Sequence, residues 1–215
     1  MGSNEIYFPS YVWKNKLNYS HKEDLISSIL KDYDENKNHD SEFNLEVTSS
    51  CMRSFYSEDL KTFSRMDLVE NLLSLIYSEF EKYLKHFDIK SKFHCDKIWY
   101  SLYEYGMETK SHDHPFRDFS GAYYLKFDKE KDNSTFFVPY SPNSTCKYPL
   151  IEPKMQCDEV IFFPSHLKHG SKKHLNTDPR ILISFDILCP DFSDHFDFGK
   201  YQKINQKMIK SLQYQ

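Results

Sequence analysis

Glycine is scarce in this chain, with 5 residues among 215. A loop that cradles phosphate needs several glycines close together, and the sequence contains no such loop. The Gly-x-Ser-x-Gly motif of one large class of serine hydrolases is also missing. The sequence therefore supports neither a nucleotide-binding loop nor a hydrolase of that class.

Long apolar runs and an excess of charge of one sign are missing as well. No run approaches the roughly 18 residues of a membrane-spanning helix, and residues 1–20 lack the apolar segment of a secretory signal. The 28 Lys and Arg residues and 32 Asp and Glu residues give a net charge of −4 without a basic stripe. We therefore expect a cytoplasmic protein whose partners include neither a membrane nor a nucleic acid.

The sequence has no Cys-x-x-Cys motif, and its five cysteines are odd in number. They are Cys51, Cys95, Cys146, Cys157 and Cys189. We expect all five to be reduced.

What the first half of the chain does contain is helical spacing of apolar residues. Ser20 and Ser64 are each followed three residues later by an acidic residue, a pattern typical of helix starts. The apolar positions that follow are Leu25, Ile26, Ile29, Leu30 and Tyr33 in the first segment, and Leu68, Leu72, Leu75, Ile76, Phe80, Tyr83, Leu84 and Phe87 in the second. Such stripes indicate packing against a core, not a catalytic role.

The second half has short runs rich in β-branched and aromatic residues, separated by turn-forming residues. The expected strands are Ile98–Tyr105, Gly121–Phe127, Thr135–Val138, Glu159–Phe163 and Arg180–Leu188. Several short strands with loops between them predict a sandwich or barrel. A closing helix is expected over Lys200–Leu212.

No interdomain linker is visible, so we expect one domain over residues 1–215. Residues 1–91 should be mainly helical, residues 92–190 should form the β core, and residues 191–215 should form a helical tail. The predicted class is α+β, with N-terminal helices packed on one face of a β-sandwich.

Two histidines, His112 and His114, stand one residue apart directly before the second expected strand. On a strand, residues i and i+2 point to the same face, so both imidazoles can share one target while Asp113 points away. His169 follows an apolar strand and a Pro-Ser turn, which makes it the best third candidate. Imidazole binds iron, zinc, copper and nickel, so the ligand type alone leaves the metal open.

Other interpretations of the histidines remain open. The His-x-His pair can be a solvated loop, and Asp113 becomes a candidate carboxylate ligand if the local chain is a turn. Asp118 is a more remote carboxylate. His166 and His174 are further imidazoles nearby, and we expect His174 on the surface because lysines and asparagine surround it.

Arg180 begins an otherwise apolar strand, which the sequence continues as Ile-Leu-Ile-Ser-Phe. A buried guanidinium needs a carboxylate or phosphate partner, and its planar fork suits a carboxylate. Arg180 is therefore either structural or, if it faces the histidines, a receptor for an acidic cosubstrate.

Four motifs in order carry a resemblance to a known family. They are HDHP at His112, SGAYYL at Ser120, FPSHLKH at Phe163 and RILISF at Arg180. With the Tyr-x-x-Gly lead-in at Tyr103, the region from Trp99 to Leu188 resembles the 2-oxoglutarate/Fe(II) oxygenases related to prolyl 4-hydroxylases. The resemblance implies a double-stranded β-helix, a form of jelly roll.

The resemblance also implies roles for individual residues. His112 and His169 would be the two histidine ligands of Fe(II), and His114 stands where the hydroxylases have an aspartate. Arg180 would bind the distal carboxylate of 2-oxoglutarate, and Ser184 or a tyrosine could add a hydrogen bond. The tyrosine candidates are Tyr103, Tyr123 and Tyr124. No catalytic residue beyond the metal centre is expected.

Three positions depart from the family pattern. Leu182 replaces a serine that usually follows the arginine, and Asp186 stands where the pattern often has asparagine. His166 replaces an aromatic residue after Phe-Pro-Ser. The first departure weakens the inference of a 2-oxoglutarate site.

The resemblance implies an oxidative reaction. Molecular oxygen and 2-oxoglutarate would be consumed, succinate released, and a C–H bond of a small molecule, amino acid or peptide hydroxylated. Three alternatives remain: a three-histidine dioxygenase of cupin type that needs no 2-oxoglutarate, a zinc hydrolase, and a non-catalytic jelly-roll module that binds metal. A homodimer is also considered.

Overall fold

The computed structural model describes residues 12–36, 51–55, 63–139 and 150–190. Within these ranges lie two helices, α1 (Lys22–Asn36) and α2 (Met66–His86), and nine strands. The strands are β1 (Trp13–Lys16), β2 (Cys51–Ser54), β3 (His94–Tyr103), β4 (Thr109–His112), β5 (Phe119–Lys126), β6 (Thr135–Phe137), β7 (Glu159–Pro164), β8 (His169–Ser171) and β9 (Arg180–Leu188). The expected C-terminal helix lies outside the described residues.

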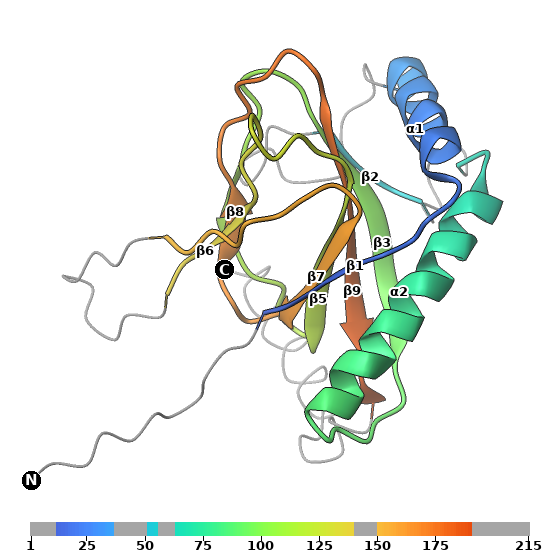
Figure 1. Ribbon diagram of the computed structural model, residues 1–215, viewed down its shortest axis with the longest axis vertical. Helices are drawn as coiled ribbons and strands as arrows, with labels where there is room; N and C mark the ends of the chain where they lie inside the picture. The colour runs from blue at the N-terminus through green and yellow to red at the C-terminus, as the bar shows by residue number, and fades with distance from the viewer. Residues whose placement is uncertain (1–11, 37–50, 56–62, 140–149, 191–215) are drawn as a thin grey trace, which may run out of the picture.

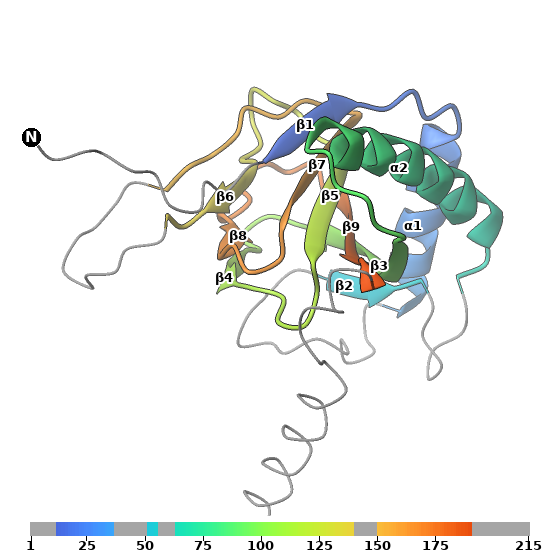
Figure 2. The same cartoon turned by 90° about the horizontal axis from the view of Figure 1, so that it is seen from below.

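The strands form two sheets that face one another. The larger has six strands in the order β1-β7-β5-β9-β3-β2, and the smaller has three in the order β4-β8-β6. Neighbouring strands are antiparallel in both sheets. Figure 1 shows both helices on the outer face of the larger sheet, and Figure 2 shows the smaller sheet on the side away from them. The predicted α+β class, with helices on one face, is confirmed.

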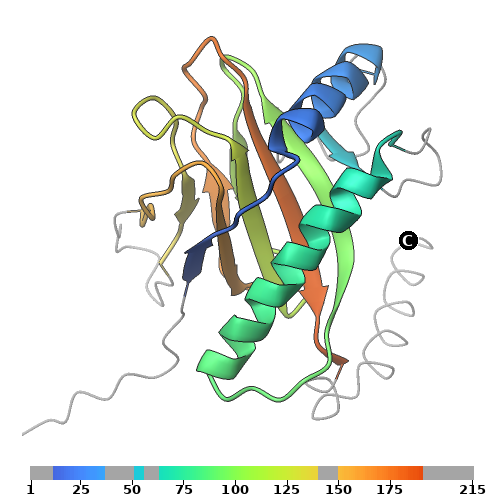
Figure 3. The same cartoon turned by 45° about the vertical axis from the view of Figure 1, so that its right-hand side comes forward.

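The two helices cover the larger sheet through their apolar faces (Figure 3). Phe80 of α2 lies 5.2 Å from Phe119 and 5.3 Å from Phe162, measured between ring centroids. Both helical stripes are therefore core, as the sequence indicates. Each helix begins one residue later than a capping box at the serine predicts, and the N-cap of α2 is Arg65, which has no side-chain cap bond.

Side-chain alternation along β9 separates an apolar face from a polar one. Ile181, Ile183 and Phe185 belong to the core beneath the helices, whereas Leu182 belongs to the smaller core between the sheets. Because successive residues of a strand point to opposite faces, Arg180, Ser184 and Asp186 share the inner face with Leu182. The strand thus brings three polar side chains into the space between the sheets.

Gly121 on β5 permits a close approach of two strands. A Cβ atom there would lie 2.3 Å from the Cζ of Phe185 and 2.5 Å from the carbonyl oxygen of Ile161. We expect Gly121→Ala to lower the free energy of unfolding by about 1–3 kcal/mol, because an extra carbon in a packed core forces its neighbours to shift. Urea unfolding measures this effect, and a variant as stable as the wild type would contradict it.

Four strands were not foreseen from the sequence: β1, β2, β4 and β8. Each has three or four residues, too few for a periodic pattern. Among the described residues, Cys95, Cys157 and Cys189 form no disulfide bond. No helix in this part of the chain is long and apolar enough to cross a membrane.

Candidate metal centre

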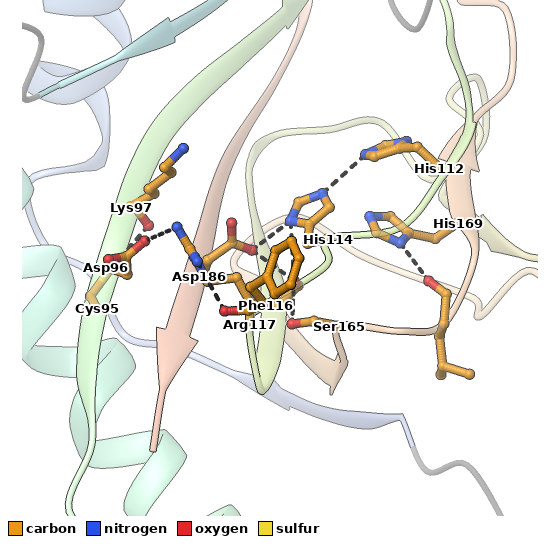
Figure 4. A network of polar contacts seen from close by, with 12 residues as sticks. Cys95, Asp96, Lys97, His112, His114, Phe116, Arg117, Ser165, His169 and Asp186 are labelled. Atoms are coloured by element: carbon orange, nitrogen blue, oxygen red, sulfur yellow. Dashed lines mark hydrogen bonds and ion pairs between the residues drawn. The ribbon is translucent and has the colours of Figure 1, made fainter. Parts of the chain in front are cut away.

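The three predicted histidines meet at the smaller sheet. His112 ends β4 and is the register partner of His169, the first residue of β8, while His114 lies just beyond β4. One ring nitrogen of each residue falls in a group whose members all lie within 4.8 Å of one another. Two side chains from adjacent strands and one from the following loop therefore converge on a single point (Figure 4).

Hydrogen bonds on the far side of each ring orient all three imidazoles. The Nδ1 atoms of His112 and His169 lie 2.9 Å and 2.8 Å from the backbone carbonyls of Lys110 and Leu167. The Nδ1 atom of His114 lies 2.6 Å from a carboxylate oxygen. Because these oxygens only accept, each Nδ1 donates its proton, and in the neutral form of each ring Nε2 carries the lone pair that a metal needs. The lone pairs face the shared centre.

The spacing of the Nε2 atoms fits a metal ion. The Nε2 atoms of His112 and His114 are 3.1 Å apart. Two ligands with bonds of about 2.1 Å are about 3.0 Å apart at a right angle and about 3.4 Å apart at a tetrahedral angle. The observed separation favours the right angle, which is the arrangement of ligands on one face of a non-heme iron site. The donor set thus fits Fe(II).

Burial keeps two of the imidazoles neutral. It lowers the pKa of His169 to about 3, with the neighbouring His112 contributing further, and it also lowers the pKa of His112. Since only a neutral imidazole binds a metal, both side chains are ready to do so at neutral pH.

The lowered pKa of His169 predicts acid sensitivity of the metal-free protein. The unfolded chain takes up a proton at this histidine near pH 6.5, whereas the folded chain does so only near pH 3. Stability should therefore fall as the pH drops below about 6.5, by at most about 1.4 kcal/mol per pH unit for this one group. His169→Gln should flatten the pH dependence of the free energy of unfolding. An equal slope in His169→Gln would contradict the assignment.

The other candidate ligands lie apart from this centre. Asp113 is exposed, and its carboxylate is not in the three-histidine group. Asp118 accepts the backbone N–H of Cys189 at 2.7 Å, a structural role, and His166 is exposed.

His174 is buried, with 1% of its surface exposed, so the expectation of a surface residue was wrong. Its Nε2 lies 2.8 Å from the carbonyl of Asp178 and its Nδ1 lies 3.4 Å from Asp132. These polar partners compensate for the burial of the imidazole, which its polar neighbours in the sequence did not suggest.

A cavity of about 40 Å³ adjoins the three histidines. Its walls include Ser184 and Tyr103, two of the residues proposed to contact 2-oxoglutarate, together with Leu182 and Ser171. Ligand pockets usually measure about 300–1,000 Å³. An organic ligand can therefore bind beside the histidines only if wall side chains move.

Tyr123 lies on the wrong face of β5 for the role suggested for it. Its ring packs in the core beneath the helices, and its hydroxyl donates to Asp158 at 3.1 Å. Tyr124, one position along, lies between the sheets and bonds Thr135 at 2.9 Å. The motif SGAYYL is apolar on both faces, so its sequence does not show which tyrosine points inward.

Arg180 is 1% exposed and lies just behind the cavity wall. Its Nη2 donates to the Ser171 hydroxyl at 2.6 Å, its Nη1 donates to the carbonyl of Asn133, and its Cζ lies 4.1 Å from the centroid of the Tyr103 ring. Its Nε has no hydrogen-bond partner, and no carboxylate in the described part of the chain forms an ion pair with it. A buried guanidinium in this state has the capacity to bind an acidic ligand.

Comparison with known proteins identifies the region that carries these features. Residues 97–186 match the profile of a family described as "Putative 2OG-Fe(II) oxygenase". By this match the segment is similar to the 2OG-Fe(II) oxygenases. It contains the three histidines and Arg180, and it confirms the resemblance seen in the motifs. A search of curated proteins gives no match.

Solved structures show that the fold around the oxygenase segment extends over most of the chain. A prolyl-4-hydroxylase from Pseudomonas putida is 10% identical with a TM-score of 0.57, covering 82% of this chain and 92% of its own. A Trichoplax adhaerens prolyl hydroxylase in complex with a hypoxia inducible factor peptide is 12% identical with a TM-score of 0.60, covering 85% and 84%. The epimerase SnoN from nogalamycin biosynthesis, in its complex with Fe3+, alpha ketoglutarate and nogalamycin RO, is 12% identical with a TM-score of 0.57. The alignment covers 83% of this chain and 78% of that one.

These likenesses confirm the double-stranded β-helix. The oxygenase family is named for Fe(II) and 2-oxoglutarate, the two cofactors that the sequence resemblance implies. The three-histidine group is a site that could hold the metal.

Proposed function

We propose that this protein is an Fe(II)- and 2-oxoglutarate-dependent oxygenase that hydroxylates a C–H bond. The observation that carries the proposal is the convergence of three Nε2 lone pairs within an oxygenase segment. Fe(II), when bound, would supply the means to activate oxygen, with 2-oxoglutarate as the reductant. The roles that follow are those of the chain's own residues.

His112, His114 and His169 would hold the ion on one side and leave its other positions to ligands. Three neutral histidines leave the site one positive charge higher than two histidines and a carboxylate. The extra charge favours an anionic chelator such as the keto acid group of 2-oxoglutarate.

Arg180 would bind the distal carboxylate of 2-oxoglutarate. Its burial without an acidic partner supports this role, because an uncompensated buried cation is costly. Tyr103 and Ser171 stand between the guanidinium and the cavity, so we expect these two side chains to adjust when the ligand enters. Ser184 lines the same cavity and can add a hydrogen bond.

The substrate would be a small molecule, an amino acid or a peptide. Phe116 is 48% exposed and has a φ of 68°, a left-handed conformation that is strained for a bulky residue. Phe116 follows His114 by two residues in the loop after β4. An apolar or aromatic group of the substrate could pack on the Phe116 ring at the edge of the metal centre.

A three-histidine dioxygenase that needs no 2-oxoglutarate is the second candidate. Among the described residues no carboxylate joins the three-histidine group, which favours this candidate. In that reaction Arg180 would bind a carboxylate of the substrate itself, so the requirement for cosubstrate separates the two candidates.

Anaerobic titration with Fe(II) and then 2-oxoglutarate tests the proposal. A visible metal-to-ligand charge-transfer band should appear on addition of 2-oxoglutarate, and admission of oxygen should then yield succinate. Tight Fe(II) binding without a band would favour the second candidate. Failure to bind Fe(II) would reject both.

A further inference from the structure

Asp186 is a buried carboxylate whose one ion-pair partner, in the described part of the chain, is the His114 imidazole. It is 4% exposed, and its Oδ1 lies 2.6 Å from the His114 Nδ1 and 2.7 Å from the Ser120 hydroxyl. In the described part of the chain no Lys or Arg forms an ion pair with it. Because a buried charge needs compensation, a positive charge on the far side of the His114 ring would stabilise it.

His114 differs from the other two histidines in how it is held. The rings of His112 and His169 donate to backbone carbonyls, whereas the ring of His114 donates to a carboxylate. A hydrogen bond to an ionised acceptor is stronger, and a carboxylate partner makes the opposite ring nitrogen a better electron donor. His114 is therefore the most strongly electron-donating of the three candidate ligands.

The position of His114 explains why it needs this partner. The residue lies beyond the end of β4, so no strand ladder fixes it. Its backbone N–H donates to the carbonyl of Ser165 at 3.0 Å, and the Ser165 hydroxyl lies 2.9 Å from that of Ser120. Ser120 and Asp186 are register partners on β5 and β9, so the larger sheet anchors the ring from behind.

We propose that Asp186 is a positioning residue that holds His114 as the third metal ligand. Through the His114 ring it supplies the negative charge that a carboxylate ligand supplies directly in a site of two histidines and one carboxylate. This inference rests on the proposed metal centre, and it assigns a role to the position where the related pattern often has asparagine.

Metal affinity of Asp186 variants tests the proposal without turnover. Asp186→Asn keeps an acceptor for the His114 ring but removes the charge, and Asp186→Ala removes both. Fe(II) affinity, measured anaerobically by competition with a chromophoric chelator, should fall about tenfold in the first variant and up to about 100-fold in the second. The absorption spectrum of the Co(II)-loaded protein should shift in Asp186→Ala. Asp96→Asn is the matched control, because Asp96 pairs with Arg117 and, in the described part of the chain, has no ion pair with a histidine.

A double-variant cycle shows whether Asp186 acts through His114. Asp186→Asn should have almost no effect on affinity in a His114→Ala background. An equal loss in both backgrounds, or wild-type affinity and spectrum in both Asp186 variants, would overturn the proposal. If Asp186→Ala does not fold, Asp186→Asn carries the test. If the wild type binds neither Fe(II) nor Co(II), the proposed function fails and this inference fails with it.

Discussion

His169→Ala is expected to cause a large loss of Fe(II) affinity. The variant lacks one of three converging imidazoles, and the remaining pair comes from a strand end and a loop. Removing a residue that only orients a metal ligand costs roughly 10–100-fold in affinity, and removing a ligand itself should cost more. Anaerobic chelator competition measures the affinity, and the charge-transfer band with 2-oxoglutarate should disappear as well.

His166→Ala is the matched control for His169→Ala. His166 is an exposed imidazole three residues earlier, in the turn before β8, so its removal takes away the same chemical group without touching the centre. We expect wild-type Fe(II) affinity in this control. Unchanged affinity in His169→Ala, or an equal loss in both variants, would exclude His169 as a ligand.

Arg180→Met should lose 2-oxoglutarate while keeping Fe(II). Methionine retains an apolar chain against the Tyr103 ring but removes the charge and every donor. Truncating one partner of a buried charge pair costs about 2–5 kcal/mol, which corresponds to roughly 30-fold to several-thousand-fold in affinity. Titration of the Fe(II)-loaded variant with 2-oxoglutarate measures the loss.

Stability separates a ligand-binding role of Arg180 from a structural one. Replacing a buried charge that has no acidic partner by an apolar residue is often neutral or stabilising. If Arg180 instead serves mainly to bind Ser171 and the carbonyl of Asn133, Arg180→Met should lower both the free energy of unfolding and the Fe(II) affinity. Wild-type affinity for 2-oxoglutarate in this variant would contradict the proposed role. Arg180→Lys keeps the charge but lacks the planar fork, so its affinity for 2-oxoglutarate should lie between those of the wild type and Arg180→Met.

The sequence predicted the long strands and both helices because their apolar residues repeat with a clear period. All five expected strands overlap observed ones, from β3 to β9. The strands that carry His112 and His169 were missed, since β4 and β8 are short and polar. Their pairing depends on tertiary contacts with each other and with β6, which no local pattern encodes.

The sequence predicted the candidate metal ligands but not the residues that hold them in place. The His-x-His spacing and the family motifs pointed to the three histidines, and the structure brings them together. The contacts of His174 with Asp132 and of His114 with Asp186 join residues far apart in the chain. Neither contact follows from spacing. The orientation of Tyr123 depended on which face of β5 meets the helices.

The register pairing of His112 with His169 gives a metal ion a second effect. The strands of the smaller sheet have four, three and three residues, so their few backbone bonds hold them weakly. An ion bound to both histidines would cross-link β4 and β8 and turn the long chain segment between them into a closed loop, as a disulfide would. Because such a ligand favours the folded state by mass action, the lifetime of this polypeptide among proteases should rise and fall with the iron supply of the cell.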